Sequence, residues 1–459
     1  MKKNTTERVG QFAVATDLTK GNITKHLISF TIPLILGNVF QLTYNAVDSI
    51  VIGRFAGNEA LAAVGTAEPV MNFLIMGITG LCVGTSVLMS NFYGAGKYED
   101  LKKEMGTCLR IGGIFSLLLF TGGLLASGII LKLMQVPEAI LDLSVSYLRV
   151  IFIGMPFTCL YNIYAAALRS VGDSKTPIRF LAFSSILNGI LDVIFVAGFR
   201  LGVFGAGLAT DIAESVSAVA CMIYVFKKVP VLHTSRRDFV PDKEFTRKTL
   251  HYGSTTALQQ CAQPIGKLAI QGMVNTLGVS TIAAFNAVGK IEDFALVPER
   301  SVSTAMMTFI AQNDGAKEKE RVRKGFFSGM TIETCYFVFI CIVLLLFHRP
   351  MLYLFSTDET ILSEGQKYFS VMAFFYFFSA MTNGMQGFFR GKKYMKVSLA
   401  GSLTQISVRV LFTFLLIERF GITGIAFACA AGWIAMLILV IGYLRYRKAC
   451  QRRTFPRMD

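Results

Sequence analysis

Charged residues are scarce in this chain of 459 residues, of which only 16% are Asp, Glu, Lys or Arg and 53% are hydrophobic. A soluble globular domain usually carries about 25% charged residues. The scarcity of charge argues against a soluble enzyme of two or three domains and indicates a chain that lies mostly in lipid. Residues 111–131 and 422–443 carry no charge at all, and each reaches the roughly 20 residues that a membrane-spanning helix needs.

Histidine is also rare, with four residues that do not cluster, and no two of the nine cysteines form a Cys-x-x-Cys pair. This pattern indicates neither a disulfide framework nor a zinc site. The sequence likewise contains no Gly-x-x-x-x-Gly-Lys-Ser/Thr loop for ATP and no Ser-His arrangement for nucleophilic catalysis. We therefore expect neither enzymatic activity nor a cofactor.

Twelve apolar segments are long enough to cross a membrane. They are 25–53, 60–92, 107–131, 140–167, 177–199, 204–226, 248–275, 280–311, 325–347, 364–389, 397–418 and 422–444. Each should be a helix because lipid cannot hydrogen-bond a bare backbone, and long runs without alternation argue against a β-barrel. The first 22 residues are polar, and the apolar stretch after them is too long for the core of a signal peptide. The predicted fold class is an all-α integral membrane protein.

Lys and Arg residues are distributed unequally between the segments that connect these spans. If both termini are cytoplasmic, 34 Lys and Arg residues fall in cytoplasmic segments and seven in external ones, as the positive-inside rule requires. The formal net charge of +16 then belongs to cytoplasmic loops and does not indicate a nucleic-acid partner. We expect a multi-pass protein of a bacterial cytoplasmic (inner) membrane with both termini in the cytoplasm.

The two halves of the chain resemble each other at a nearly constant spacing. Gly94 matches Gly315 and Arg169 matches Arg390, in both cases 221 residues further on. A repeat of six helices in the same orientation predicts two lobes related by a pseudo-twofold axis along the membrane normal, a common transporter plan with a site near mid-bilayer. The predicted parts are a cytoplasmic tail at 1–22, an N-lobe at 23–228, a cytoplasmic linker at 229–246, a C-lobe at 247–447 and a basic cytoplasmic tail at 448–459.

Ionisable side chains inside the spans are informative because each costs roughly 2.5–3.5 kcal/mol at the bilayer centre. Asp48 shares a helix face with Tyr44, four residues earlier, and Asp192 shares one with Asn188. Two carboxylates and an amide from separate helices could surround one cation or one proton. The alternative is a structural role, in which Asp192 bridges helices. Pro33, in the same span as Asp48, can bend that helix.

Polar side chains in later spans allow two interpretations each. Asp211 and Glu214, in the sixth span, either join the same site or lie near the membrane surface. The seventh span carries one polar stripe that recurs every four residues: Gln259, Gln263, Lys267, Gln271 and Asn275. Lys267 could pair with Glu292 or Asp293, and such a pair would either fix helix packing or contact a substrate.

Several short motifs together resemble the multidrug and toxic compound extrusion (MATE) transporters over about residues 15–447. The motifs are Pro33, Val47-Asp48, Gly57 with Ala60-Leu61-Ala62-Ala63, Gly94-Ala95-Gly96, Leu168-Arg169-Ser170-Val171-Gly172-Asp173, Asn188 with Leu191-Asp192, and Gly205-Ala206-Gly207-Leu208-Ala209-Thr210. The resemblance implies a V-shaped pair of six-helix lobes that exports small amphipathic, cationic organic compounds in exchange for inward H⁺ or Na⁺. We expect a monomer that has the substrate and the lipid bilayer as its partners.

The same resemblance assigns candidate residues. Coupling to the ion falls to Asp48 with its companions Tyr44, Asn188, Asp192 and Thr210, and a bound Na⁺ would lie at Asp48, Asn188 and Asp192. The candidates for the substrate cavity and for gating are Pro33, Asn162, Gln263, Lys267 and Glu292. Another branch of the family places acids at positions that correspond here to Gln263 and Ser379, neither of which carries a charge. Coupling is therefore expected in the N-lobe, as in the DinF-like branch.

Two other functions remain compatible with the sequence. A flippase for a lipid-linked saccharide, from the same superfamily, would share the repeat but would favour a strongly cationic cavity, whereas the acids inside the spans favour an antiporter. A channel would also be helical, but an internal repeat with scattered buried acids suits alternating access better.

Overall fold

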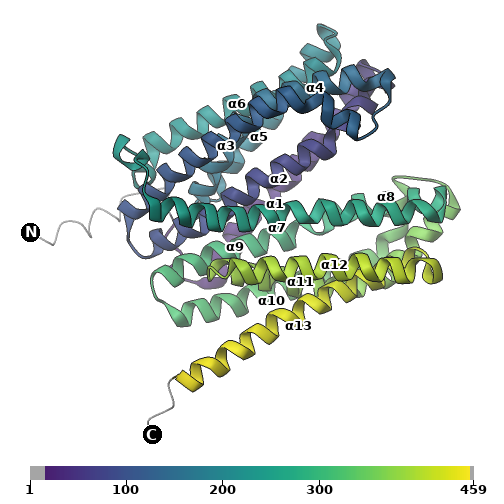
Figure 1. The fold of residues 1–459 in the computed structure, drawn as a ribbon. Coiled ribbons are helices and arrows are strands. Elements are labelled where there is room, and N and C mark those ends of the chain that lie inside the picture. Colours follow the sequence, from purple (N-terminus) through teal and green to yellow (C-terminus); the bar gives the residue numbers. More distant parts are fainter. Residues whose placement is uncertain (1–15, 455–459) are drawn as a thin grey trace, which may run out of the picture. The chain divides into compact units, whose positions relative to one another are not determined.

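The computed structural model of the chain describes residues 16–454, in which the regular elements are all helices (Figure 1). The first half contains α1 (Ile23–Phe55), α2 (Asn58–Gly94), α3 (Tyr98–Leu133), α4 (Glu138–Ser170), α5 (Lys175–Asp192), η2 (Val193–Gly198) and α6 (Gly202–Lys228). The second half contains α7 (Lys243–Val274), η5 (Asn275–Leu277), α8 (Val279–Ala295), α9 (Val297–Gly315), α10 (Lys319–Tyr353), α11 (Glu359–Gly391), α12 (Met395–Phe420) and α13 (Ile422–Thr454). The predicted all-α fold class is confirmed.

The two predicted terminal tails are only partly covered by this description. Of the basic residues assigned to them, Lys2, Lys3, Arg8 and Arg457 lie outside the described residues. The cytoplasmic location of these tails therefore stays a prediction.

The described residues form two compact units. Unit 1 contains Ser29–Ala257 and Ala311–Glu318, together with the described residues up to Asn22. Unit 2 contains Ile23–Ile28, Leu258–Ile310 and the described chain from Lys319 onward. The linker between α6 and α7 thus belongs to unit 1, and the change of unit falls inside α7. The lobe boundaries given by the sequence remain predictions.

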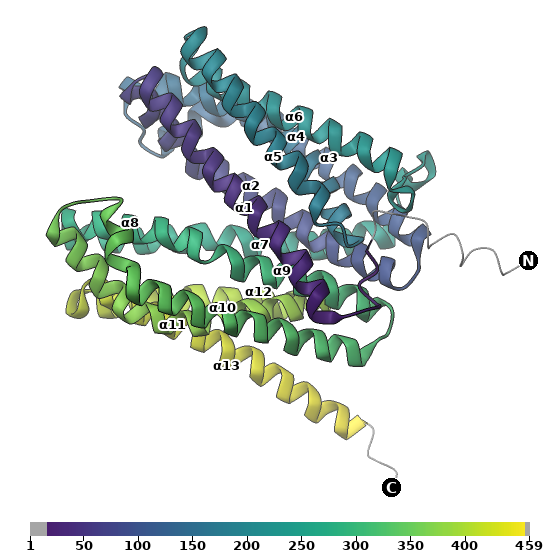
Figure 2. The ribbon, with the colours of Figure 1, turned by 180° about the vertical axis from the view of Figure 1, so that it is seen from behind.

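Each unit has a hydrophobic core built where its helices face one another. In unit 1, Met105 of α3 and Leu148 of α4 are fully buried, and in unit 2 Leu344 of α10 and Ile425 of α13 are fully buried. The helices α12 and α13 of unit 2 lie side by side (Figures 1 and 2).

Large apolar side chains also remain exposed on both units, for example Leu125, which is 82% exposed, and Ile438, which is 68% exposed. An aqueous surface would be unfavourable for so many of these side chains, whereas lipid accommodates them.

Nine helical segments are long and apolar enough to cross a membrane: α1, α2, α3, α4, α5 with η2, α6, α10, α12 and α13. Among the described residues, the predicted spans at 248–275, 280–311 and 364–389 do not meet the same standard of length and composition. Polar side chains explain the difference in α7, which carries the predicted stripe of Gln and Lys residues. Length and composition alone therefore support nine of the twelve predicted spans.

The predicted span at 280–311 is interrupted in the structure. The helix α8 ends at Ala295 and α9 begins at Val297, so Leu296 separates them. Pro298 accounts for the break, because proline has no N–H to donate to a carbonyl one turn earlier and its ring crowds that turn. The Tyr336 hydroxyl of α10 donates to the Ala295 carbonyl at 2.7 Å, which satisfies one of the acceptors exposed by the break.

The internal repeat has a direct structural counterpart in unit 1. A Cβ added at Gly94, the last residue of α2, would overlap the backbone carbonyl of Gln312, and a Cβ at Gly315 would overlap that of Asn91. Asn91 and Gln312 are themselves 221 residues apart, as are the two glycines. Equivalent residues of the repeat therefore make reciprocal contacts that require glycine at both positions.

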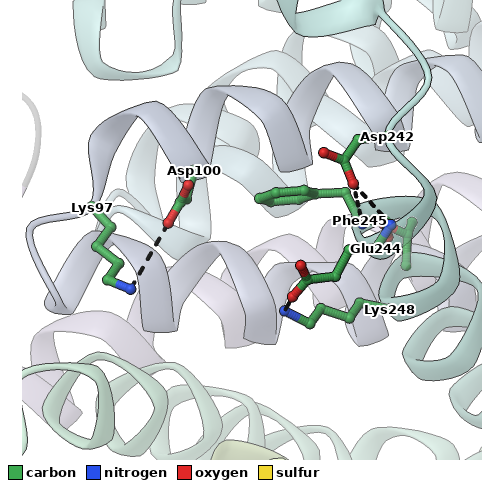
Figure 3. A network of polar contacts seen from close by, with 7 residues as sticks. Lys97, Asp100, Asp242, Glu244, Phe245 and Lys248 are labelled. Atoms are coloured by element: carbon green, nitrogen blue, oxygen red, sulfur yellow. Dashed lines mark hydrogen bonds and ion pairs between the residues drawn. The ribbon is translucent and has the colours of Figure 1, made fainter.

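The linker is packed onto α3 and is not a loose connection. It contains two short helices, η3 (Pro230–Leu232) and η4 (Arg236–Phe239). Arg110 of α3 donates to the Phe239 carbonyl at 3.0 Å and to the Thr246 hydroxyl at 2.8 Å. Asp242 then begins α7 by accepting from the backbone N–H groups of Glu244 and Phe245 (Figure 3).

Acidification should weaken this cap. The N–H of Phe245 lowers the pKa of the exposed Asp242 carboxyl, with the N–H of Glu244 and the charges of Lys103 and Lys248 acting in the same direction. A carboxyl with a lowered pKa stabilises the fold above its unfolded pKa of about 3.9, and the contribution is lost as the pH falls through the folded value. We expect Asp242→Ala to unfold at a lower temperature than the native protein at pH 7 and at nearly the same temperature well below pH 4. Thermal unfolding in detergent checks this, and a difference independent of pH would contradict it.

Candidate functional site

Two carboxyl groups predicted for the site meet inside unit 1. Asp48 of α1 is 9% exposed, Asp192 at the end of α5 is fully buried, and their side chains are within hydrogen-bonding reach of each other. Asp48 Oδ1 and Asp192 Oδ1 are buried and have no hydrogen-bond partner. Two ionised carboxylates repel each other in a buried environment, so a contact of this kind requires that the pair hold a proton or a cation.

Three of the predicted companions surround this pair. With its amide nitrogen facing Asp192, Asn188 donates to Asp192 Oδ2 at 3.2 Å and accepts from the Thr210 backbone N–H at 3.3 Å. The Tyr44 side chain lies near the Thr210 side chain and within electrostatic range of Asp48. The five residues predicted for ion coupling therefore form one contiguous group contributed by α1, α5 and α6.

The backbone is irregular immediately after Asp192. The π-helix η2 starts at Val193, and Phe199 N–H donates to the Ile194 carbonyl at 2.8 Å. The π-helix η2 forms the C-terminal end of the span that α5 begins. π-Helical turns are rare and occur frequently at functional sites. The sequence contains no proline or other signal in 193–198 that would have predicted this feature.

A second group of acids adjoins the first on α6. The Asp211 carboxyl, 9% exposed, packs against the backbone of Gly154 in α4, and the Thr158 hydroxyl donates to Glu214 Oε2. Tyr44 is within electrostatic range of Glu214 as well as of Asp48, so it connects the two groups. Of the two interpretations given by the sequence, inclusion in the site fits this arrangement better than a position at the surface.

Asn162 and Pro33 lie further from the carboxyl pair. Asn162 donates to the Thr158 carbonyl of its own helix at 2.8 Å, which places it beside the contact between Thr158 and Glu214. Pro33 lies inside α1, which continues as one helix from Ile23 to Phe55. Fifteen residues separate it from Asp48, or about 22 Å along a helix axis, so any influence on the pair must act through the helix.

No basic side chain neutralises these acids in the described part of unit 1. Asp48, Asp192, Asp211 and Glu214 all lie in the helix bundle, and no ion pair with Lys or Arg involves any of them among the described residues. A buried charge without a partner costs several kcal/mol. Binding of positive charge at this group, either as protons or as a cation, would therefore be favourable.

The residues predicted for the substrate cavity in unit 2 do not meet at one place. Gln263 is exposed, and Lys267 pairs with Asp293 at 3.9 Å rather than with Glu292. Glu292 instead accepts from the hydroxyls of Tyr368 at 2.9 Å and Tyr376 at 2.8 Å. Their role as substrate contacts remains a prediction.

The Lys267 pair should contribute little to stability. The two side chains are 63% and 37% exposed, and exposed ion pairs are worth about 0–1 kcal/mol. Asp293→Asn should therefore lower the free energy of unfolding by less than about 1 kcal/mol. Thermal unfolding in detergent measures this, and a loss of several kcal/mol would contradict a weak, solvent-exposed pair.

The sequence alone assigns no role to two acids that are fully buried in unit 2. Glu299 of α9 accepts from the Ser379 hydroxyl at 2.7 Å and from the Asn383 amide at 3.1 Å, and Glu333 of α10 has no hydrogen-bond partner at either oxygen. The signal for Glu333 was available, because it is the only charged residue in the predicted span 325–347. Ser379 is uncharged, but a carboxyl from another helix lies against it.

Comparison with known proteins identifies the family to which this arrangement belongs. The MatE family model matches residues 33–194 and 256–415, which is most of the chain and includes both halves of the repeat. The chain belongs to the MatE family. The resemblance found in the sequence is thereby confirmed, and family membership places the chain among membrane transporters rather than enzymes.

Individual MatE relatives agree with this assignment. The probable multidrug resistance protein YpnP of Bacillus subtilis is 28% identical over 87% of this chain and 88% of its own length. A FAD transporter of Shewanella oneidensis is 26% identical over 77% of this chain and 79% of its own. A solved outward-facing MATE family transporter, 23% identical, covers 96% of this chain with a TM-score of 0.89 and is itself covered completely. The MatE fold therefore extends over nearly the whole chain.

Proposed function

We propose that this MatE protein exports small amphipathic organic cations by antiport, with coupling to the ion at Asp48 and Asp192 in unit 1. The observation that carries the proposal is the buried contact between these two carboxyl groups, without a basic partner among the described residues. A substrate cation and a coupling ion can both compensate the same negative charge. Competition for that charge is what an exchanger needs.

The coupling ion that fits the described contacts best is a proton. Asp48 and Asp192 can hydrogen-bond each other only if one of them is protonated. A Na⁺ bound by Asp48, Asn188 and Asp192 would need oxygen ligands, yet the Asn188 oxygen accepts from Thr210 N–H when its amide nitrogen faces Asp192. We therefore assign H⁺ to the arrangement seen here.

Exchange follows from charge balance at the pair. With the pair ionised and the site open to the cytoplasm, an organic cation is favoured there. When the site opens outward, a proton neutralises the pair, the substrate loses its electrostatic partner, and it leaves. The scheme couples the two fluxes only because proton and substrate interact differently with the two states.

Three buried acids and the partly buried Glu214 favour a cationic substrate over an anionic one. Asp211 and Glu214 add to the negative charge near the pair, and Tyr44 links the two groups. One relative is named a FAD transporter, and FAD is an anionic dinucleotide. The negative charges of unit 1 instead favour a substrate of positive charge. The saccharide flippase alternative is not favoured, since the matched family is MatE and the relative YpnP is named a probable multidrug resistance protein.

We also propose the cellular setting. The unequal distribution of Lys and Arg favours cytoplasmic termini, and the bacterial relatives agree with a cytoplasmic membrane. The protein should work as a monomer within the lipid bilayer.

Drug susceptibility of a bacterial host that lacks its own major efflux pumps tests the function. Cells that express the protein should tolerate higher concentrations of lipophilic cationic dyes and biocides, with little change for neutral or anionic compounds of similar size. Equal protection against all three classes would contradict a charge-selected substrate. No protection by a protein shown to be present in the membrane would contradict drug export.

A further inference from the structure

Unit 2 contains a pair of buried carboxyl groups that the proposed function does not use. Glu299 lies in the first turn of α9, just after the break at Leu296, and is fully buried. Its Oε2 accepts from Ser379 at 2.7 Å and from Asn383 at 3.1 Å, both on α11, while Oε1 has no partner. Two donors on one oxygen stabilise a negative charge on Glu299.

Glu333 approaches the same place from α10. It is also fully buried, and neither of its oxygens has a hydrogen-bond partner. Its Cγ lies 3.7 Å from the position that a Cβ on Gly384 would occupy, and Gly384 directly follows Asn383, which donates to Glu299. The two carboxyl groups are within electrostatic range of each other.

Few other ionisable groups act on this pair. Tyr336 of α10 is within electrostatic range of both acids, but its hydroxyl donates to the Ala295 carbonyl. Arg300 of α9 acts on Glu299 from an exposed position. The other elements that contribute to the surroundings present Ser379 and Asn383, which do not titrate, and the side chain of Met330, which packs against Gly384. Among the described residues no buried base neutralises Glu333.

The difference between the two environments decides where a proton resides. An ionised carboxylate that is buried without any donor, within electrostatic range of a second carboxylate, is strongly disfavoured relative to the neutral acid. Glu299 has two donors and Glu333 has none, so the neutral form belongs on Glu333. The two acids are within electrostatic range of each other and neither has a basic partner in a salt bridge among the described residues, so ionisation of both is disfavoured and the pair holds one proton.

We propose that Glu333 and Glu299 form a second, exchangeable proton-binding site, located in unit 2, in which Glu333 carries the proton and Glu299 carries the charge. The site is separate from the pair of Asp48 and Asp192. Each unit of the repeat then holds its own proton on a pair of carboxyl groups. The positions within the repeat differ, since Glu333 is on α10 and Asp48 on α1.

Infrared difference spectroscopy of the purified full-length protein tests the site directly. At neutral pH we expect a carbonyl-stretch band of a protonated carboxylic acid that shifts in D₂O and disappears in Glu333→Gln. The control is Glu320→Gln, which changes an acid of the same helix that is 75% exposed and should keep the band. A spectrum of Glu333→Gln identical to that of the native protein would overturn the proposal.

A second variant keeps the test decisive if Glu333→Gln does not fold. In Glu299→Gln the neighbouring negative charge is gone, so the band of Glu333 should persist but vanish at a lower pH than in the native protein. An unchanged titration would show that the two groups do not interact, and loss of the band would assign the proton to Glu299. Either result would overturn the site as described.

The outcome is independent of the proposed coupling at Asp48. The band that Glu333→Gln removes should still be present in Asp48→Asn, whether or not that variant transports. Loss of the Glu333 band in Asp48→Asn would overturn the separation of the two sites, and failure of transport alone would leave the Glu333 site standing.

Discussion

Asp48→Asn should remove coupled export while leaving the folded protein intact. Asparagine has nearly the same shape as aspartate but cannot carry the charge for which substrate and proton compete. Coupling free energies between sites are typically 1–3 kcal/mol, so exchange driven by the gradient should fall by roughly 5- to 150-fold. The measurement is the initial rate of efflux of a fluorescent organic cation from energised cells, normalised to the amount of protein in the membrane.

The matched control for this prediction is Asp142→Asn, which removes an exposed acid from α4 in the same unit. It should export at the native rate. Native efflux by Asp48→Asn would remove Asp48 from the mechanism, and an equal loss in both variants would indicate a general effect of charge. Thermal unfolding of both purified proteins establishes that they are folded.

Gly94→Ala should destabilise the protein more than any surface substitution. The added methyl group would overlap the backbone carbonyl of Gln312, which has no flexible side chain to move aside. Overpacking of this kind costs typically 1–3 kcal/mol. We expect a lower unfolding temperature in detergent and a lower yield of folded protein. Gly315→Ala should have the same effect, because its added methyl group would overlap the backbone carbonyl of Asn91.

Gly113→Ala provides the control for helix propensity. Gly113 lies within α3, and apart from its chain neighbours and the backbone of its own helical turns no atom lies within 4 Å of the Cβ that the substitution adds. Alanine is favoured over glycine inside a helix by roughly 1 kcal/mol, so this variant should be as stable as the native protein or more so. Native stability of Gly94→Ala would contradict the close contact between the two repeat motifs.

Most of the helices could be predicted from the sequence because lipid imposes long apolar segments. The predicted span 25–53 corresponds to α1 at Ile23–Phe55, and 397–418 corresponds to α12 at Met395–Phe420. The helices are longer than the spans, as with α3, which starts at Tyr98 rather than 107, because polar helix ends carry no hydropathy signal. The break at Leu296 is not visible in hydropathy, although Pro298 in the predicted span 280–311 is a sequence signal for it.

The site was predictable only in part. Spacing of four residues placed Tyr44 with Asp48 and Asn188 with Asp192, but the contact between the two aspartates joins α1 to α5 and depends on how the helices rotate. The same limit applies to Glu299 and Glu333, which come from different helices and meet at α11. A sequence without aligned relatives contains no information on such rotations, whereas a lone charge in a span, such as Glu333, is visible directly.

Transport in proteoliposomes with separately imposed gradients tests the central claim most directly. Purified protein, reconstituted with a fluorescent organic cation, would be given a pH gradient at equal Na⁺ or a Na⁺ gradient at equal pH. We expect the pH gradient alone to drive uphill movement of the cation, and Asp48→Asn to slow that movement by the same roughly 5- to 150-fold. Equal uphill transport by Asp48→Asn and the native protein, or transport driven only by the Na⁺ gradient, would contradict the claim that a proton held between Asp48 and Asp192 couples the two fluxes.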